Sequence, residues 1–230
     1  MSRLRARTSF DFEVERLPRF AARVQKGLPI GFVARRGGDF FLVFRGTVTV
    51  EEWVRNLNIG LTPFLRDGFG RVHEGFLQTY GLVRSSVLEA LGAGGGGKHL
   101  FVAGHSLGGA LATLAVADVS RGTMYPSPTL YTFGSPRVGD RFFAAAFNRR
   151  NGPGSFRIVN TSDVVVSVPL PVPLAGILGG FFTHVDTPVD FTSQEESLEK
   201  NHMMDTYLGA IGEHRELGPV AFLQSILGRR

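Results

Sequence analysis

The chain has 230 residues, 43% of them hydrophobic, and no cysteine, which excludes disulfide bonds, thiolate catalysis and cysteine-ligated metals. Its formal net charge is +5, but the 25 Lys and Arg residues are interleaved with Asp and Glu along the chain. This pattern indicates a solvated basic surface, or a weak preference for anionic lipid, and not the continuous basic groove by which proteins bind nucleic acid.

The first part of the chain predicts a β-hairpin. Residues 1–10 are basic but contain no apolar core, so we expect no secretory signal there, and the location stays open between the cytoplasm and secretion after removal of a signal. The pattern from Leu17 to Lys26 is compatible with a short helix. Two apolar runs, Ile30–Ala34 and Phe40–Phe44, then flank a Gly-rich turn, as in a hairpin.

Two helices are expected before the central motif. Val48–Asn58 has the pattern of a short amphipathic helix, and Glu74 to Leu91 carries apolar residues at helical spacing. The glycines of Gly92–Gly97 end the second helix. Because no internal repeat or Pro/Ser-rich linker divides the sequence, we expect residues 1–230 to form one domain, with the oligomeric state left open.

The centre of the chain is an apolar run from Leu100 that leads into Gly104-His105-Ser106-Leu107-Gly108 and then an Ala- and Leu-rich helical run to Val119. A G-x-S-x-G pattern between a strand and a helix is typical of a nucleophile elbow, whose tight turn exposes the serine oxygen. We therefore predict that Ser106 is a nucleophile. The N–H of Leu107, at the start of the helix, is placed to stabilise a developing oxyanion.

Strands and helices alternate after this motif. Thr129–Phe133 and Ser155–Asn160 are predicted strands, and Asp140 is expected to cap a helix from Arg141 to Arg149. This alternation predicts an α/β fold with a mainly parallel central sheet flanked by helices. Ligands of such sheets bind beyond the carboxyl ends of the strands, where Asp163 is expected.

An uncharged segment then runs from Val164 to Phe182. Its length approaches the roughly 20 residues of a transmembrane helix. Three prolines and three glycines interrupt it, so we expect no membrane span. Two interpretations stay open: an apolar loop that borders an active site, and a core segment packed under the sheet.

A serine nucleophile needs a base to take its proton and a carboxylate to orient that base. In hydrolases of the α/β type the chain order is serine, acid, histidine. His202 is favoured as the base because it lies in an expected loop, between the polar stretch Thr192–Asn201 and a helix Met203–Ile211. The other histidines after the motif are His184, in a strand-like stretch, and His214, near the charged C-terminus.

Asp163 is favoured as the acid because it follows a strand end directly. Asp140 has the capping role given above, and Asp186 and Asp190 lie in strand-like surroundings. Taken alone, Asp163 would be a turn residue and His202 a helix-start residue, and only the complete set suggests catalysis.

Five segments together resemble the fungal-type class 3 lipases, in the same order and at similar spacing. They are Phe44–Thr47, Gly104–Ala110, Gly134–Gly139, Asn160 with Asp163, and His202 with Tyr207, within roughly Gly31 to Leu208. The resemblance implies an α/β-hydrolase fold with Ser106 as nucleophile, His202 as base and Asp163 as acid. It further implies that Thr47 and Leu107 form the oxyanion hole and that Val48–Asn58 is a lid.

The function implied by the resemblance is that of a serine carboxylic ester hydrolase without cofactor or metal, in first place a lipase that cleaves acylglycerol esters at a lipid–water interface. Phospholipase A1, short-chain or aryl esterase and acyltransferase activities use the same chemistry and stay open. A non-catalytic lipid-surface protein on a hydrolase scaffold is an alternative from another class. The intact set of Ser106, Asp163 and His202 argues against it.

Overall fold

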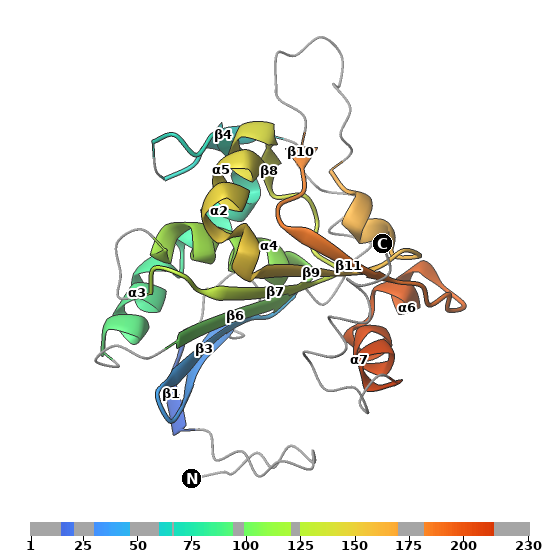
Figure 1. Ribbon diagram of the computed structural model, residues 1–230, viewed down its shortest axis with the longest axis horizontal. Coiled ribbons are helices and arrows are strands. Elements are labelled where there is room, and N and C mark those ends of the chain that lie inside the picture. Colours follow the sequence, from blue (N-terminus) through green and yellow to red (C-terminus); the bar gives the residue numbers. More distant parts are fainter. Residues whose placement is uncertain are drawn as a thin grey trace.

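The computed structural model describes residues 15–20, 30–46, 60–65, 67–93, 99–120, 125–169 and 182–213 (Figure 1). Within these residues a seven-stranded sheet forms the centre of the molecule. Its strands lie in the order β1 (Glu15–Phe20), β2 (Gly31–Arg36), β3 (Asp39–Phe44), β6 (His99–His105), β7 (Thr129–Phe133), β9 (Ser155–Asn160) and β11 (Thr187–Phe191).

The central sheet is parallel over most of its width. Strands β3, β6, β7, β9 and β11 run parallel, whereas β1, β2 and β3 pair antiparallel. The predicted hairpin is confirmed as β2–β3, with its turn at Gly37. The predicted α/β class with a mainly parallel sheet is therefore confirmed, and the carboxyl ends of β6, β7 and β9 meet at one edge.

A second, antiparallel sheet lies over one end of the first (Figure 1). Its strands follow the order β10 (Phe182–Thr183), β8 (Gly139–Asp140), β5 (Arg71–His73) and β4 (Leu61–Pro63). The sequence does not predict β4, β5 or β8, because strands of two or three residues carry too little alternation to be recognised.

Helices cover both faces of the central sheet (Figure 1). Helix α4 (Leu107–Val119) is buried along its whole length and packs on β6 and β7, with α2 (Glu74–Gly81) and α5 (Arg141–Asn151) against it. On the opposite face, α7 (Met204–Glu213) contributes Tyr207 to a smaller core with Ile158 and Val189. The remaining helices are α3 (Arg84–Ala93), α6 (Leu198–His202) and the 3-10 turns η1 (Gly152–Gly154) and η2 (Val164–Ser167).

Two expectations about local structure are wrong. The residues from Leu17 to Phe20 belong to strand β1 and not to a helix. Pairing with β2 outweighs the local pattern, and Pro18, which has no N–H, falls where the register shifts between Arg16 and Arg19. The expected single helix from Glu74 to Leu91 is broken at Leu82 and Val83 into α2 and α3.

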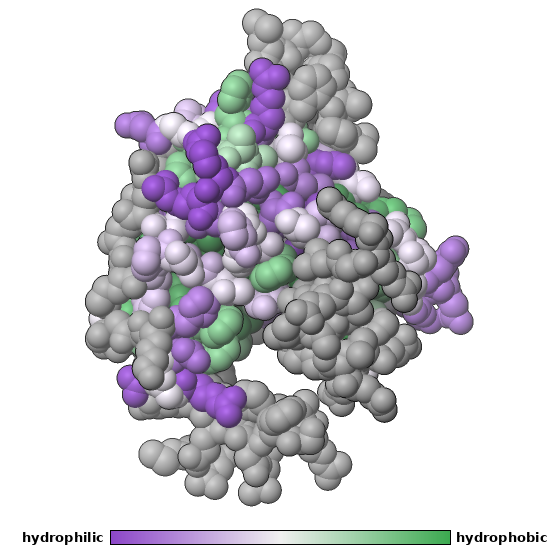
Figure 2. Space-filling model, viewed as in Figure 1, coloured by the Kyte–Doolittle hydropathy of each residue, from purple (hydrophilic) through white to green (hydrophobic). Residues whose placement is uncertain are grey.

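Several predicted features fall outside the described residues. These are the helix or lid at Val48–Asn58 and residues 170–181 of the apolar segment. No helix in the described part of the chain has the length and apolar character that crossing a membrane requires. On the face seen in Figure 2, hydrophilic residues gather over α5, whose Arg141, Arg149 and Arg150 are exposed.

Candidate active site

Ser106 occupies the tight turn between β6 and α4. Its backbone has φ 57° and ψ −128°, a left-handed φ that residues other than glycine rarely adopt. A Cβ at Gly104 would lie 2.1 Å from the backbone oxygen of Gly108, so the strand and the helix approach more closely than any side chain allows. The strand, turn and helix predicted around Ser106 are therefore present, and the turn is strained where the serine lies.

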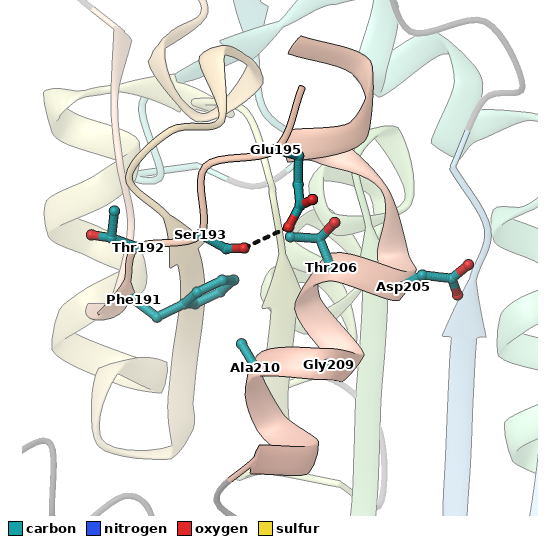
Figure 3. Close-up of a pocket in the computed structure, with 8 residues that line it drawn as sticks. All are labelled: Phe191, Thr192, Ser193, Glu195, Asp205, Thr206, Gly209 and Ala210. Carbon is teal, nitrogen blue, oxygen red and sulfur yellow. Dashed lines mark hydrogen bonds between the residues drawn. The ribbon is translucent and has the colours of Figure 1, made fainter. Parts of the chain in front are cut away.

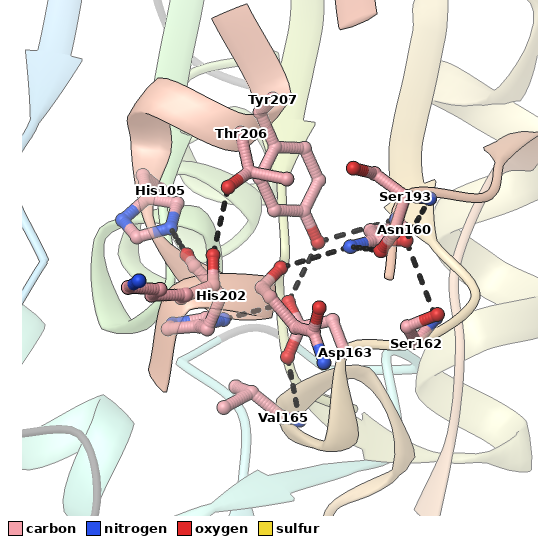
Figure 4. A network of polar contacts seen from close by, with 11 residues as sticks. His105, Asn160, Ser162, Asp163, Val165, Ser193, His202, Thr206 and Tyr207 are labelled. Atoms are coloured by element: carbon pink, nitrogen blue, oxygen red, sulfur yellow. Dashed lines mark hydrogen bonds and ion pairs between the residues drawn. The ribbon is translucent and has the colours of Figure 1, made fainter. Parts of the chain in front are cut away.

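Asp163 and His202 come together beside this turn. Asp163 follows β9 and caps η2, and His202 is the last residue of α6. The Nδ1 atom of His202 lies 2.6 Å from Oδ2 of Asp163 (Figure 4), and both side chains are buried. A carboxylate only accepts hydrogen bonds, so Nδ1 carries the proton and Nε2 keeps a lone pair that can take another.

The carboxylate of Asp163 has two further donors. The hydroxyl of Tyr207 donates to Oδ2 over 2.6 Å, and the backbone N–H of Val165 donates to Oδ1 over 2.8 Å. Burial and the neighbouring Asp163 raise the pKa of Tyr207 above its ordinary value. The phenol therefore stays protonated and remains a donor over the whole range in which an esterase works.

The serine oxygen and the free nitrogen of the histidine are both unsatisfied. Ser106 Oγ and His202 Nε2 are buried and have no hydrogen-bond partner among the described residues, so they do not bond to each other in this structure. The two residues nevertheless lie in neighbouring parts of the structure. His105, which precedes Ser106 in the chain, has its ring centroid 4.6 Å from that of His202. Buried polar atoms without partners are rare, and beside a nucleophile elbow a ligand or reacting group can complete the contact.

The other candidate acids and bases have different partners. His184 places Nε2 2.6 Å from the backbone oxygen of Val166, and burial lowers its pKa to about 3. Asp140 accepts hydrogen bonds from two backbone N–H groups at the start of α5, as its predicted capping role requires. Asp190 is exposed on β11, and His214 lies outside the described residues.

Two expectations near these residues are wrong. The strand expected at Thr183–Asp186 ends at Thr183, and Asp186 has a left-handed φ of 58° before β11 begins. Its side chain is fully buried 3.5 Å from Arg157, and burial raises its pKa to about 8. His202 does not lie in a loop but is the last residue of the short helix α6. The sequence does not predict this helix, because five residues are too few to show a periodic pattern.

One of the two expected oxyanion donors can be placed. Leu107 is the first residue of α4, so its N–H has no carbonyl one turn earlier to bond and lies at the positive end of the helix dipole. Thr47 lies outside the described residues. Its neighbour Gly46 packs against the elbow, since a Cβ there would lie 3.1 Å from Cβ of Ser106.

Gly134 is a site residue whose role the sequence does not reveal. It has φ 56°, and a Cβ there would lie 2.8 Å from Oδ2 of Asp163 and 3.0 Å from both Cε1 of His202 and the hydroxyl of Tyr207. Asn160 and Tyr207 occur among the segments that resemble the lipase family, but that pattern assigns them no role. For Gly134 and Asn160, the sequence feature that could have indicated a role is their position, since both stand at the carboxyl end of a parallel strand.

Within the described ranges, no group of three or more His, Asp and Glu side chains is arranged as a metal site. The absence of a cofactor stays a prediction. The arrangement of Ser106, His202 and Leu107 is suited to acyl transfer, because it offers a candidate nucleophile, an oriented base and a donor for an oxyanion.

Comparison with known proteins agrees with this geometry. The family model "Lipase (class 3)" matches residues 41–172. The chain is similar to the secreted mono- and diacylglycerol lipase A of Penicillium cyclopium, with 38% identity over 56% of this chain and 42% of that protein. It is also similar to phospholipase A1 EG1 of Oryza sativa subsp. indica, with 32% identity over 81% of this chain and 52% of that protein.

A solved structure shows the same fold. The native Rhizomucor miehei lipase propeptide complex matches with a TM-score of 0.65 and 28% identity, over 79% of this chain and 58% of that chain. The chain thus spans about half the length of the relatives it matches. From the family match, the shared α/β-hydrolase fold and the elbow at Ser106, the chain belongs to the class 3 lipase family.

Proposed function

We propose that this chain is a serine carboxylic ester hydrolase that cleaves acylglycerol esters through an acyl-enzyme intermediate. The observation that carries the proposal is the strained Ser106 beside a buried pair in which His202 Nδ1 lies 2.6 Å from Asp163. The named activity of the Penicillium relative, a mono- and diacylglycerol lipase, supports acylglycerols as the substrate class.

The first half of the reaction transfers the acyl group. His202 Nε2 takes the hydroxyl proton of Ser106 as Oγ attacks the ester carbonyl carbon, and the carbonyl oxygen becomes an oxyanion. The N–H of Leu107, with Thr47 as second donor, stabilises that charge. The imidazolium then gives its proton to the leaving alcohol, the carbon–oxygen ester bond breaks, and Ser106 holds the acyl group.

The second half returns the enzyme to its starting state. Water attacks the acyl carbonyl while His202 Nε2 takes its proton, and the same donors hold the second oxyanion. The bond from the acyl carbon to Ser106 Oγ breaks, Oγ recovers the proton from His202, and a carboxylic acid leaves. Asp163 keeps the imidazole in one tautomer and stabilises its positive charge in both halves.

A second candidate is phospholipase A1 activity, in which the same chemistry cleaves an acyl ester of a phospholipid. It is favoured by the similarity to phospholipase A1 EG1, which spans 81% of this chain. Both substrates are lipids that gather at an interface with water, and we propose that the enzyme works there.

The experiment that tests the proposal measures acid release from emulsified mono-, di- and triacylglycerols, from phosphatidylcholine vesicles and from short soluble esters. Acylglycerol hydrolysis that falls by about 10⁴-fold or more in Ser106→Ala is the expected result. The matched control is Ser120→Ala at the other end of α4, whose hydroxyl is also buried and has no hydrogen-bond partner in the ranges that the structure describes.

Other outcomes replace the proposal with a specific alternative. Release from phosphatidylcholine alone assigns phospholipase activity, and release from soluble esters alone assigns an esterase. A wild-type protein that binds these lipids, releases no acid and fails to react with a fluorophosphonate would be the non-catalytic lipid-surface protein.

A further inference from the structure

The helix that carries the proposed base is short and needs support at its end. Helix α6 spans only Leu198–His202, and its first three residues are exposed. The last carbonyl groups of any helix have no partner within the helix. In a helix of five residues this leaves most of the carbonyls to be satisfied from elsewhere.

Three consecutive carbonyls at this end each accept a hydrogen bond from a side chain on a different element (Figure 4). The hydroxyl of Thr206, on α7, donates to Lys200 O over 2.7 Å. The amide of Asn160, at the end of β9, donates to Asn201 O over 3.0 Å. The Nε2–H of His105, at the end of β6, donates to His202 O over 2.7 Å. We call Thr206, Asn160 and His105 the α6 cap.

Asn160 joins the proposed base to the proposed acid. Its amide also donates to Ser193 O over 2.8 Å, and its side-chain oxygen accepts from the N–H groups of Ser162 and Ser193 over 3.2 and 3.0 Å. Its backbone oxygen accepts from the N–H of Asp163 over 3.0 Å. All the bonding positions of this buried side chain are used, so it fixes the turn of Asp163 and the end of α6 relative to one another.

The side chain of His105 contacts the proposed base at the backbone carbonyl of His202. A carbonyl oxygen can only accept, so Nε2 of His105 carries a proton and Nδ1 does not. Burial and the adjacent His202 lower the pKa of His105 to about 4, so its ring is neutral near neutral pH. A neutral ring donates to His202 O without adding a second positive charge beside the imidazolium that forms during catalysis.

We propose that Thr206, Asn160 and His105 are positioning residues that hold His202 against Asp163 by capping α6. The proposal rests on the ester hydrolase activity proposed above. It assigns a role to three described residues that form no hydrogen bond with Ser106 Oγ or His202 Nε2. A base displaced by a fraction of an ångström loses much of its rate advantage while substrate binding is left as it was.

Thr206 allows a mild test, because it can be changed without entering the core. It lines a cavity of about 540 Å³ beside α7, together with Phe191, Thr192, Ser193, Glu195, Asp205, Gly209 and Ala210 (Figure 3). Valine has the shape of threonine without the hydroxyl, and serine keeps the hydroxyl. Thr206→Val and Thr206→Ser are therefore a matched pair at a site open to solvent.

Two further comparisons cover the other members of the cap, the half-buried His105 and the buried Asn160. His105→Gln keeps an N–H donor at a similar reach, whereas His105→Leu removes it. Asn160→Ala is matched by Asn151→Ala, because Asn151 is also buried but its side-chain amide makes no hydrogen bond within the described part of the chain. Each variant is measured for kcat and KM on a soluble short-chain ester, for melting temperature, and for the proton NMR resonance between His202 Nδ1 and Asp163.

The proposal predicts that Thr206→Val, His105→Leu and Asn160→Ala lower kcat by about tenfold or more with little change in KM. The NMR resonance should shift or broaden in the same variants. Thr206→Ser, His105→Gln and Asn151→Ala should keep both kcat and the resonance near the wild-type values. This combination separates positioning from general loss of stability.

Two results would overturn it. One is that the cap variants keep kcat and the resonance, and the other is that kcat falls in all variants, Asn151→Ala included, in proportion to melting temperature. If the wild-type protein hydrolyses no ester, the proposed function is contradicted, but the proposal about the α6 cap is not. In that case the resonance still decides whether the cap holds His202.

Discussion

The hydroxyl of Tyr207 and Nδ1 of His202 both lie 2.6 Å from the same oxygen of Asp163, Oδ2. The phenol is buried, and its ring packs edge-on against Phe133 and Phe191. This contact gives the carboxylate a fixed donor that does not depend on the protonation of the histidine. It restrains the rotation of the Asp163 carboxylate, which orients His202, the proposed base.

Tyr207→Phe removes that donor and keeps the ring. We expect kcat to fall by about tenfold at unchanged KM, because the carboxylate is freer to rotate away from His202. The free energy of unfolding should fall by about 2 kcal/mol, because the hydroxyl donates to a buried carboxylate and also accepts from the N–H of Asn160 over 3.3 Å, and both bonds are lost. Steady-state kinetics and urea unfolding measure the two effects. An unchanged kcat would show that the phenol has only a packing role.

Gly134→Ala should abolish most activity. A methyl group at this position would lie 2.8 Å from Oδ2 of Asp163 and 3.0 Å from Cε1 of His202, so the pair must separate. We expect a loss of kcat of about a hundredfold. Gly37→Ala is the control, since Gly37 has a similar φ of 58° and a Cβ there meets nothing within 4 Å.

Both alanine variants should lose about 1 kcal/mol of stability from the left-handed backbone. Only the variant at Gly134 should lose activity. Equal activity in the two variants would mean that the acid and base tolerate the added methyl group, contrary to the geometry described here.

The positions of the proposed nucleophile and acid in the fold were predictable because the features that point to them are local. Ser106 lies in five contiguous residues flanked by a strand pattern and a helix pattern, and Asp163 comes three residues after the end of a strand. Parallel strands end at the same edge, so alternation alone brings these positions near each other. Strand β1 was missed because its conformation depends on its partner β2, which no local pattern reveals.

The support of the base could not be predicted, because it depends on contacts between distant parts of the chain. His105 and His202 are 97 positions apart, and Asn160 and Asn201 are 41 apart. A histidine beside the nucleophile and an asparagine at a strand end have many roles available to them. Only the folded chain shows which carbonyls these side chains meet.

Asp186 should make the protein less stable as the pH rises. Burial raises the pKa of Asp186 from 3.8 to about 8, so between these values the unfolded chain has released a proton that the folded chain keeps. The unfolded state binds fewer protons, and stability therefore falls with rising pH over this window. Near pH 6.5 the histidines with lowered pKa still release protons from the unfolded chain, but they do so equally in the wild type and in a variant of Asp186, so comparing the two proteins cancels their contribution.

The measurement is urea unfolding of wild type and Asp186→Asn at pH 6.5 and 8. Asparagine tolerates the left-handed backbone and has the same shape. The wild type should lose stability between the two values, by up to about 1 kcal/mol per pH unit, and the variant should lose less. Parallel pH profiles for the two proteins would contradict a buried, protonated Asp186.

His184 should have the opposite effect in acid. Burial and the charge of Arg157 lower the pKa of His184 from 6.5 to about 3, so between these values the unfolded chain binds a proton that the folded chain does not. Stability due to this residue is present above pH 6.5 and is lost as the pH falls. His184→Gln keeps a donor to Val166 O, and it should flatten the loss between pH 6.5 and 4 without removing the share that belongs to His105. An unchanged slope in the variant would rule this contribution out.

The central claim is that Ser106 is a nucleophile activated by His202 and Asp163. The most direct measurement is peptide mapping by mass spectrometry after reaction with a fluorophosphonate, which forms a stable adduct only with an activated serine. We predict one adduct, on the peptide that contains Ser106. It should be absent in Ser106→Ala, form far more slowly in His202→Ala, and be unchanged in Ser120→Ala. An adduct on another serine, or one that persists at full rate in His202→Ala, would contradict this claim.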